Sequence, residues 1–372
     1  MRSFLIVWLF SHSWGAASAF ESRADGSGKD FLKWCLDPNA PESIKNTVDA
    51  LLALVQSSDC HSGAELLNGL SEMVLEDQKL TDLRPFVSFS NLRILDLTNN
   101  QLIDLSPLAE ITNLRELTLS INPIEDLSPI ANLKQLDTLA LWGTKIRDLS
   151  GLMSLKSLSY LNIGNNDIDD LSPLPSLQQL ETLYLTQNNI SDLSPLAFMP
   201  NLVWLNLDEN KVDDLSPIIA LKKLNFLYFD NNLVEDLTPL SSLTNLRRLS
   251  FAGNRVIQIL PIQPLVKLNV LSLARNKIRY IFPIHELREL LSLDASANLI
   301  QEIDVLQNLT KLKDLRLMGN RIIDLHWLKG VLDLNYLYLW DNPIADGRVL
   351  KTEKNCPTTI EVSPLLSDFC RI

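Results

Sequence analysis

The chain has 372 residues, and its 33 Lys and Arg against 45 Asp and Glu give a formal net charge of −12 at pH 7. This acidic balance argues against a nucleic-acid-binding protein, because a phosphate backbone would repel it. No apolar run reaches the roughly 18 residues that a membrane-spanning helix needs, so we predict no membrane span.

The first residues have the pattern of a secretory signal peptide. Arg2 precedes an apolar run over 4–10, and the sequence A-S-A at 17–19 is a typical cleavage site. We therefore expect residues 1–19 to be a signal peptide and the mature chain to begin at Phe20. The protein is then exported, either periplasmic or secreted.

Residues 20–67 lack the repeat that follows them. Pro41 precedes a segment in which Ile44, Val48 and Leu51 share one helical face, which predicts an amphipathic helix. The first coil of a stacked-repeat protein needs a cap over its apolar face. We therefore predict a helical N-terminal cap over 20–67.

A leucine-rich unit then recurs every 22 residues over 68–344. One unit runs L-x-x-L-x-L-x-x-N from Leu92 to Asn100, and the next repeats this pattern from Leu114 to Asn122. About 12–13 such turns without an insertion are typical of a solenoid. We predict an α/β solenoid, a leucine-rich repeat arc whose L-x-x-L-x-L segments form a parallel β-sheet on the concave side.

The asparagine of this motif recurs in every clear turn but one, where Thr144 replaces it. Its side chain has donors and an acceptor, so stacked asparagines can satisfy backbone groups between turns. Because threonine cannot reproduce the amide, we expect local loosening at Thr144. The predicted structural asparagine ladder consists of Asn100, Asn122, Asn166, Asn188, Asn210, Asn232, Asn254, Asn276, Asn298, Asn320 and Asn342.

The return segment of each turn carries apolar residues three positions apart, such as Leu102, Leu105 and Leu108. This spacing predicts 3₁₀ or short helical structure on the convex side. Ser106 and Pro107 fit an N-cap followed by the first helical position.

A column of aspartates precedes the Ser-Pro pairs and allows two interpretations. The carboxylates could bind calcium, or each could accept N–H groups of its own turn. The turn interpretation is favoured, because one carboxylate per turn does not gather several oxygens around one ion; we predict no metal and no cofactor. The column consists of Asp82, Asp104, Asp126, Asp148, Asp170, Asp192, Asp214, Asp236 and Asp324.

Four cysteines flank the repeats, two on each side. Of the three possible pairings, Cys35–Cys60 with Cys356–Cys370 is preferred, because the others would bridge opposite ends of a long rod. A zinc site is the rival interpretation, but the C-x₂-C spacing is absent. We predict one disulfide in the N-terminal cap and one in a short C-terminal cap over 345–372, as an oxidising compartment permits.

The non-leucine strand positions face outward from the concave sheet and carry two groups of aromatic residues. Aromatic side chains with a charged border are typical of protein-binding hot spots, although aromatics also favour strands for packing alone. The acidic border predicts a partner with a basic patch. The candidate partner-binding residues are Trp142, Tyr160, Tyr184, Trp204, Asp208, Glu209, Phe226, Tyr228, Asp230, Tyr336, Tyr338 and Trp340.

The segments N-I-S-D-L-S-P-L at 189–196 and L-T-N-L-R-R-L at 243–249 resemble internalin-type bacterial leucine-rich repeats. The resemblance covers roughly residues 70 to 342 and implies the same fold. It also implies an exported binding protein that engages a protein partner with its concave sheet.

The function we expect is non-enzymatic recognition of a protein or peptide by a monomer. A structural envelope protein or a glycan-binding protein is the alternative, because aromatic platforms also stack on sugar rings. Catalysis is disfavoured, since no catalytic motif is present and the four histidines do not converge in the repeat geometry. The histidines are His12, His61, His285 and His326.

Two turns depart from the Asp-Leu-Ser-Pro pattern of the return segment. Leu260, Tyr280 and Phe282 occupy positions that are usually polar. Degeneration of the repeat explains this departure, and a second, lateral contact surface is the alternative.

Overall fold

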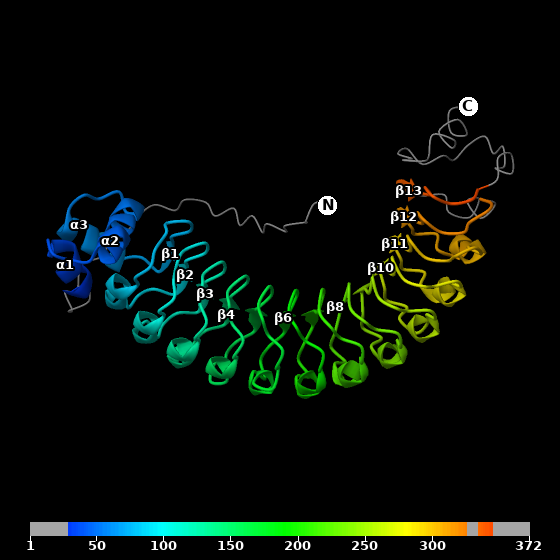
Figure 1. Cartoon of the computed structure of the whole chain (residues 1–372), viewed down its shortest axis with the longest axis horizontal. Helices are drawn as coiled ribbons and strands as arrows, with labels where there is room; N and C mark the ends of the chain where they lie inside the picture. Colours follow the sequence, from blue (N-terminus) through cyan, green and yellow to red (C-terminus); the bar gives the residue numbers. More distant parts are fainter. Residues whose placement is uncertain (1–28, 326–333, 345–372) are drawn as a thin grey trace, which may run out of the picture.

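The computed structural model describes residues 29–325 and 334–344. They form an arc whose inner side is lined by strands and whose outer side is lined by tight 3₁₀ turns (Figure 1). Three helices cover the N-terminal end, namely α1 (Lys29–Leu36), α2 (Glu42–Leu54) and α3 (Cys60–Asn68). The predicted signal peptide, C-terminal cap and Cys356–Cys370 disulfide lie outside the described residues.

The strands form one open parallel sheet in which each strand pairs with those of the turns before and after it, so the predicted solenoid is confirmed. The register places each residue beside the one a full repeat later, as with Leu95 and Leu117. The thirteen strands are β1 (Glu72–Val74), β2 (Ile94–Asp96), β3 (Glu116–Thr118), β4 (Thr138–Ala140), β5 (Tyr160–Asn162), β6 (Thr182–Tyr184), β7 (Trp204–Asn206), β8 (Phe226–Tyr228), β9 (Arg248–Ser250), β10 (Val270–Ser272), β11 (Ser292–Asp294), β12 (Asp314–Arg316) and β13 (Tyr336–Tyr338).

The leucines of successive turns stack into one continuous apolar core between the sheet and the outer side. In the turn of β2, Leu95, Leu97, Leu102, Leu105 and Leu108 are at most 1% exposed. Burying one such side chain stabilises the fold by roughly 1.5–3 kcal/mol, and only a neighbouring turn supplies the cover. The 3₁₀ segments of the outer side are η1 (Arg84–Ser88), η2 (Ser106–Glu110), η3 (Ser128–Asn132), η4 (Ser150–Leu152), η5 (Leu174–Ser176), η6 (Ser194–Phe198), η7 (Ser216–Ala220), η8 (Thr238–Ser242), η9 (Leu260–Ile262), η10 (Phe282–Glu286) and η11 (Asp304–Asn308).

In η1 to η4 and in η6 to η8, an aspartate accepts the N–H of the first residue, and the serine cap that we predicted is not formed. Asp104 Oδ1 accepts a hydrogen bond from the backbone N–H of Ser106 at 2.8 Å, while Leu105 occupies the N-cap position. The prediction for Ser106 was wrong because Ser106 is already the first residue of the segment, and its own N–H donates to the aspartate two residues earlier. Interactions with the hydroxyl and the N–H of Ser106 lower the pKa of the Asp104 carboxyl. The aspartate column therefore accepts turn N–H groups, as the favoured interpretation required.

Each ladder asparagine bridges two turns. Asn188 Oδ1 accepts the N–H of Ile168 at 3.0 Å, and its Nδ2 donates to the carbonyl oxygens of Ile163 and Leu185, both at 3.0 Å. These buried backbone groups end the strand pairing and have no further strand partner. The same three contacts recur at Asn100, Asn122, Asn166, Asn210, Asn232, Asn254, Asn276, Asn298, Asn320 and Asn342.

Thr144 joins this ladder through its hydroxyl alone. Its Oγ1 lies 2.6 Å from Asn166 Oδ1 and 3.2 Å from the Leu141 carbonyl oxygen. Because Asn166 Oδ1 is now shared, its bond from the N–H of Ile146 lengthens to 3.3 Å, against 3.0 Å for the corresponding bond at Asn188. This longer bond agrees with the loosening expected at the threonine.

Replacing Thr144 with asparagine is therefore expected to raise the free energy of unfolding by about 1 kcal/mol. The amide can accept the N–H of Ile124 and donate to the carbonyl groups of Leu119 and Leu141, as at every other ladder position. Urea unfolding measures the change, with Thr144→Ser as a control that keeps only the hydroxyl. An asparagine variant no more stable than wild type would contradict the prediction.

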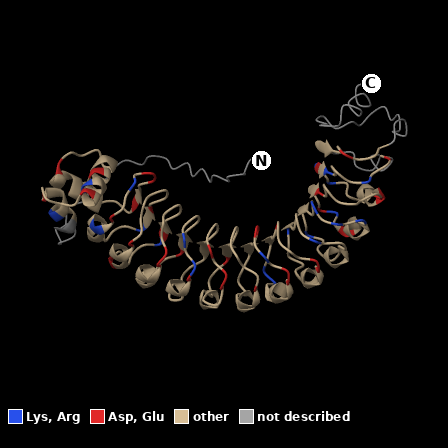
Figure 2. Ribbon diagram, in the orientation of Figure 1, with Lys and Arg blue, Asp and Glu red and all other residues tan. Residues whose placement is uncertain are grey.

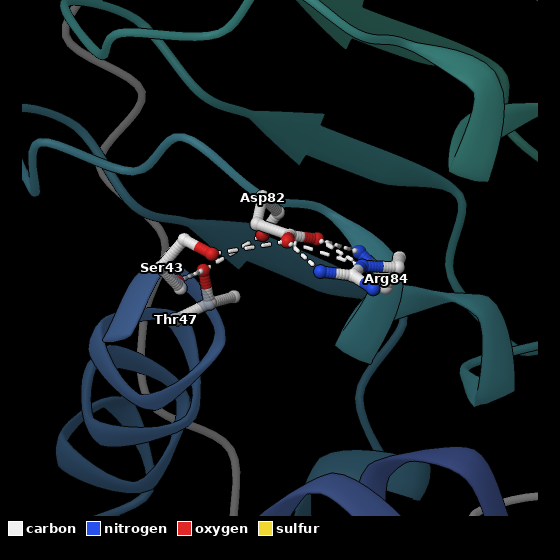
Figure 3. A network of polar contacts seen from close by, with 4 residues as sticks. All are labelled: Ser43, Thr47, Asp82 and Arg84. Carbon is white, nitrogen blue, oxygen red and sulfur yellow. Dashed lines mark hydrogen bonds and ion pairs between the residues drawn. The ribbon is translucent and has the colours of Figure 1, made fainter. Parts of the chain in front are cut away.

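Polar contacts join the N-terminal cap to the first turn (Figure 3). Thr47 of α2 donates from Oγ1 to the Asp82 carbonyl oxygen at 2.7 Å, and Ser43 Oγ donates to Asp82 Oδ2 at 3.2 Å. Arg84 approaches the same carboxylate through Nε, 2.9 Å from Oδ1. Burial alone would raise the pKa of Asp82, but its interactions with Arg84 and Ser43 lower it below the ordinary value. The carboxylate is therefore ionised and fixes α2 against the repeats.

The predicted Cys35–Cys60 disulfide is present and joins α1 to α3, with a Cα–Cα distance of 5.9 Å. Phe31 of α1 packs against Phe89 of the first turn, with ring centroids 5.7 Å apart, and both rings are buried. The cap thus covers the apolar end of the core. Within 29–325 and 334–344, no helix has the length and apolar character needed to cross a membrane.

Candidate functional site

Five aromatic side chains form a continuous row on the inner face of β5 to β8, which we call the aromatic row. The ring centroids of Tyr160 and Tyr184 are 5.8 Å apart, and Tyr184 lies 5.8 Å from Trp204. Trp204 in turn lies 4.6 Å from Phe226 and 5.4 Å from Tyr228. These separations are typical of favourable aromatic pairs. Four adjacent strands therefore present one contiguous aromatic surface.

The two-residue alternation of a strand places this row on the concave face. Each member is next to a strand leucine that is fully buried in the core, such as Leu183 in β6 and Leu205 in β7, so the aromatic side chains face the other way. All five rings are partly exposed. Burial and then the neighbouring Tyr160 and Tyr228 raise the pKa of Tyr184 to about 12. Its phenol is therefore uncharged at neutral pH, and the row is an apolar surface with hydroxyl groups.

Trp204 is the centre of the row, because it contacts rings on both β6 and β8. Its indole Nε1 is buried and has no hydrogen-bond partner within the described ranges. The indole is thus held by ring packing and not by a polar contact inside the protein. Removing it would separate the tyrosines of β5 and β6 from the rings of β8.

The other predicted aromatic residues lie apart from the row. Trp142 is 37% exposed and lies over Gly164, where a Cβ atom would be 2.9 Å from its Cδ1; among the described residues it makes no ring contact with the row. Tyr336, Tyr338 and Trp340 are at the C-terminal end, five strands beyond β8. There the rings of Tyr338 and Trp340 are 6.4 Å apart. The structure thus separates the nine predicted aromatic residues into a central row of five and four residues that lie outside it.

Two of the predicted acidic residues are engaged by the protein itself. Asp208 Oδ1 accepts the N–H of Asp230 at 2.6 Å, and Asp230 Oδ1 accepts the N–H of Ala252 at 2.7 Å and the Ser250 hydroxyl at 2.6 Å. Burial, and then the charge of Asp230, raises the pKa of Asp208 to about 7. Burial also raises the pKa of Asp230, although the Ser250 and Ala252 bonds oppose the rise. These carboxyls present less negative charge than their number indicates.

The third predicted acid, Glu209, is exposed and accepts a hydrogen bond from Gln187 Nε2 at 2.9 Å. Basic as well as acidic residues occur along the arc (Figure 2). Two exposed arginines that the sequence analysis did not select lie in turns that follow the row. The guanidinium of Arg248 lies 5.9 Å from the Phe226 ring centre, and Arg275 Nη2 donates to Asn231 Oδ1 at 3.2 Å. Arg248 occupies the same strand position as Phe226, one repeat later, and this position could have identified Arg248 from the sequence.

The lateral residues Leu260, Tyr280 and Phe282 are 62%, 68% and 69% exposed and belong to turns that depart from the repeat pattern. The Phe282 ring stacks on His285, with centroids 4.6 Å apart. Leu260 and Phe282 begin η9 and η10 on the outer side of the arc, whereas the aromatic row lies on the inner sheet. A role for them as a second contact surface stays a prediction.

The fold and the repeat register define a leucine-rich repeat protein. A family model described as "Leucine-rich repeat region" matches residues 72–215, and one described as "Leucine Rich repeats (2 copies)" matches 200–242. No curated protein matches the chain in sequence.

Solved structures define the type of repeat protein. An internalin, InlF, from Listeria monocytogenes is 29% identical, covers 82% of this chain and 91% of its own, and has a TM-score of 0.77. Internalin C2 from the same organism is 30% identical, with coverages of 60% and 97% and a TM-score of 0.53. The functional domain of Listeria monocytogenes InlJ, 24% identical, shares the fold with coverages of 84% and 66% and a TM-score of 0.71. The chain belongs to the internalin-type leucine-rich repeat proteins.

Proposed function

We propose that this protein is an exported, non-enzymatic binding protein of bacterial origin that recognises a protein or peptide through the aromatic row. The main support for this proposal is that five partly exposed rings contact one another across β5 to β8. Large rings on a rigid sheet bury much area at little entropic cost, which is the property of binding hot spots. The row has the width of four strands, roughly 14 Å between the outer two.

Export is supported by three features. The signal pattern at 1–19 precedes the cap, the cap contains the Cys35–Cys60 disulfide, and the chain belongs to the internalin type. Disulfides persist in oxidising compartments outside the cytosol. These observations favour a periplasmic or secreted protein.

A peptide hormone receptor shares this fold. The plant peptide hormone receptor RGFR1, which shares the fold at 20% identity with a TM-score of 0.58, has been solved in complex with RGF2. In our proposal the aromatic row provides the anchor, and Trp142, Glu209 and the C-terminal rings contact outlying parts of a larger partner. Sugar rings also stack on aromatic side chains, so a glycan array is the test of the alternative function.

The Trp204→Ala variant is expected to bind the partner about 30-fold more weakly than wild type. The partner is captured from envelope and culture-supernatant fractions with the mature protein as bait, and its affinity is then measured by titration. Phe282→Ala is the control, because it removes an aromatic ring that is exposed on the outer side, away from the aromatic row. Both variants must first unfold with wild-type cooperativity.

Equal capture by wild type and the Trp204→Ala variant would contradict the concave site. Loss of capture in Phe282→Ala alone would instead assign recognition to the lateral surface. Binding of a glycan class that depends on Trp204 would replace the protein partner with a carbohydrate and keep the site.

A further inference from the structure

Two arginines extend over the C-terminal edge of the aromatic row. Arg248 pairs in register with Phe226 across β8 and β9, and its guanidinium lies 5.9 Å from that ring centre. Burial raises the pKa of Tyr228, and an interaction with Arg248 opposes the rise, so the guanidinium is also close to that phenol. Arg275 begins in the turn after β10 and reaches back two turns to Asn231, at 3.2 Å. Arg248 thus lies against the row, and Arg275 reaches the turn that follows β8, the last strand of the row.

The inner surface of the repeats between the two arginines is made of small residues. Ser250 lies beside Tyr228 in the register of β8 and β9, and Ser250, Ala252 and Ala274 are buried. No large side chain stands on these strand positions between Arg248 and Arg275. A ligand group can therefore approach the sheet backbone there, with the Tyr228 ring on one side.

Neither arginine forms an ion pair with a carboxylate in the described ranges, although other arginines do. Arg316 pairs with Asp314 at 3.0 Å, and Arg147 pairs with Asp169 at 2.7 Å. Asp230 directs Oδ1 to Ser250 and Ala252, and the charge of Arg275 opposes the rise that burial causes in the pKa of this carboxyl without forming an ion pair with it. Arg248 and Arg275 are consequently exposed positive charges beside an apolar surface.

We propose that the partner segment bound on the aromatic row carries carboxylates next to its apolar anchor, and that Arg248 and Arg275 receive these carboxylates. The inference rests on the proposed function and specifies the chemistry of its partner. A guanidinium presents its donors in the planar geometry that a carboxylate accepts, and it retains its charge at any physiological pH. The sequence alone favoured a basic partner because Asp208 and Asp230 were counted as free, whereas both are hydrogen-bonded to the next turn.

The test uses three sets of synthetic peptides of equal length, all containing a Trp-Phe pair. One set adds Asp and Glu, one adds Lys and Arg, and one adds Ser and Gln. Wild-type protein is expected to bind the acidic set about tenfold more tightly than the neutral set, with a preference that falls as salt is added. Arg248→Gln/Arg275→Gln is expected to lose this preference, which is measured within each variant as the ratio of its affinities for the acidic and the neutral set.

Arg279→Gln is the matched control, because it removes an exposed arginine from the outer side of the arc, and it should keep the acidic preference. Arg248→Lys/Arg275→Lys should keep part of it, since the charge remains and the planar geometry is lost. If the glutamine pair does not fold, the salt dependence and the lysine pair provide the same comparison.

The inference is overturned if the acidic set binds no more tightly than the neutral set, which includes the absence of any binding. It is also overturned if the basic set binds most tightly, or if the acidic preference survives removal of both arginines. These outcomes leave the proposed function standing as long as Trp204→Ala still weakens capture of the native partner. A native partner that binds Trp204→Ala as it binds wild type would overturn the proposed function itself.

Discussion

Asn188→Ala is expected to lower the free energy of unfolding by about 3 kcal/mol. The substitution leaves the buried N–H of Ile168 without its acceptor, because Asn188 Oδ1 is the oxygen that it contacts, at 3.0 Å. It also removes two donors from the carbonyl groups of Ile163 and Leu185. Those carbonyls keep Asn166 and Asn210 as second donors, so the largest part of the cost comes from the orphaned N–H.

The control is Asn189→Ala, the next residue, which is exposed and should change stability by no more than about 0.5 kcal/mol. Urea unfolding gives the global change. Hydrogen exchange gives the local one, because the Ile168 amide should lose protection before amides in distant turns. Equal stability of the two alanine variants would show that the ladder contributes little.

Asp208→Asn is expected to stabilise the protein by about 3 kcal/mol at about pH 9 and to have almost no effect near pH 4. Burial, and then the charge of Asp230, raises the pKa of Asp208 to about 7, well above its unfolded value of 3.8. Folding therefore favours the protonated carboxyl, and ionisation opposes folding. The full shift would correspond to about 4 kcal/mol, which we reduce because the side chain retains contact with solvent.

The wild type should thus lose stability as the pH rises from about 4 through 7, and the asparagine variant should lose less of it. Thermal unfolding across this pH range measures the difference. Asp192→Asn is a control that should change the pH dependence of stability in the opposite direction. Interactions with the Ser194 hydroxyl and N–H lower the pKa of Asp192. Asp192 stabilises the folded chain above its unfolded pKa and loses this effect as the pH falls. A pH profile unchanged by Asp208→Asn would contradict the raised pKa.

The repeat register predicts most of the fold, because a leucine that recurs at the same position of every turn packs in the same layer of the core. Leu95 and Leu117 become neighbours in the sheet, and both are buried as their alternation requires. The asparagine contacts follow from the same register. The cap of the 3₁₀ segments did not follow, because Asp104 and Ser106 can both reach the first N–H groups and the sequence alone does not rank them.

The candidate site could be predicted only in part, because the position of a residue in its strand determines which side of the sheet it faces but not its side-chain conformation. The columns correctly place Trp204 and Tyr228 on the inner sheet. They do not show that Asp208 bonds to the next turn, nor that Arg275 reaches Asn231, 44 positions earlier in the chain. Charge counted from the sequence therefore differs from the charge that a partner would meet.

The direction of the asparagine contacts has a consequence for how such a chain can change in evolution. Each asparagine completes the backbone of the turn before it, through a carbonyl 25 positions back and an N–H 20 positions back. Gain or loss of one whole 22-residue unit leaves every such contact with an equivalent partner. An insertion or deletion of any other length would place an asparagine out of register with its partners. The aromatic row lies on this same succession of strands. A single duplication or deletion can therefore lengthen or shorten the row by one strand.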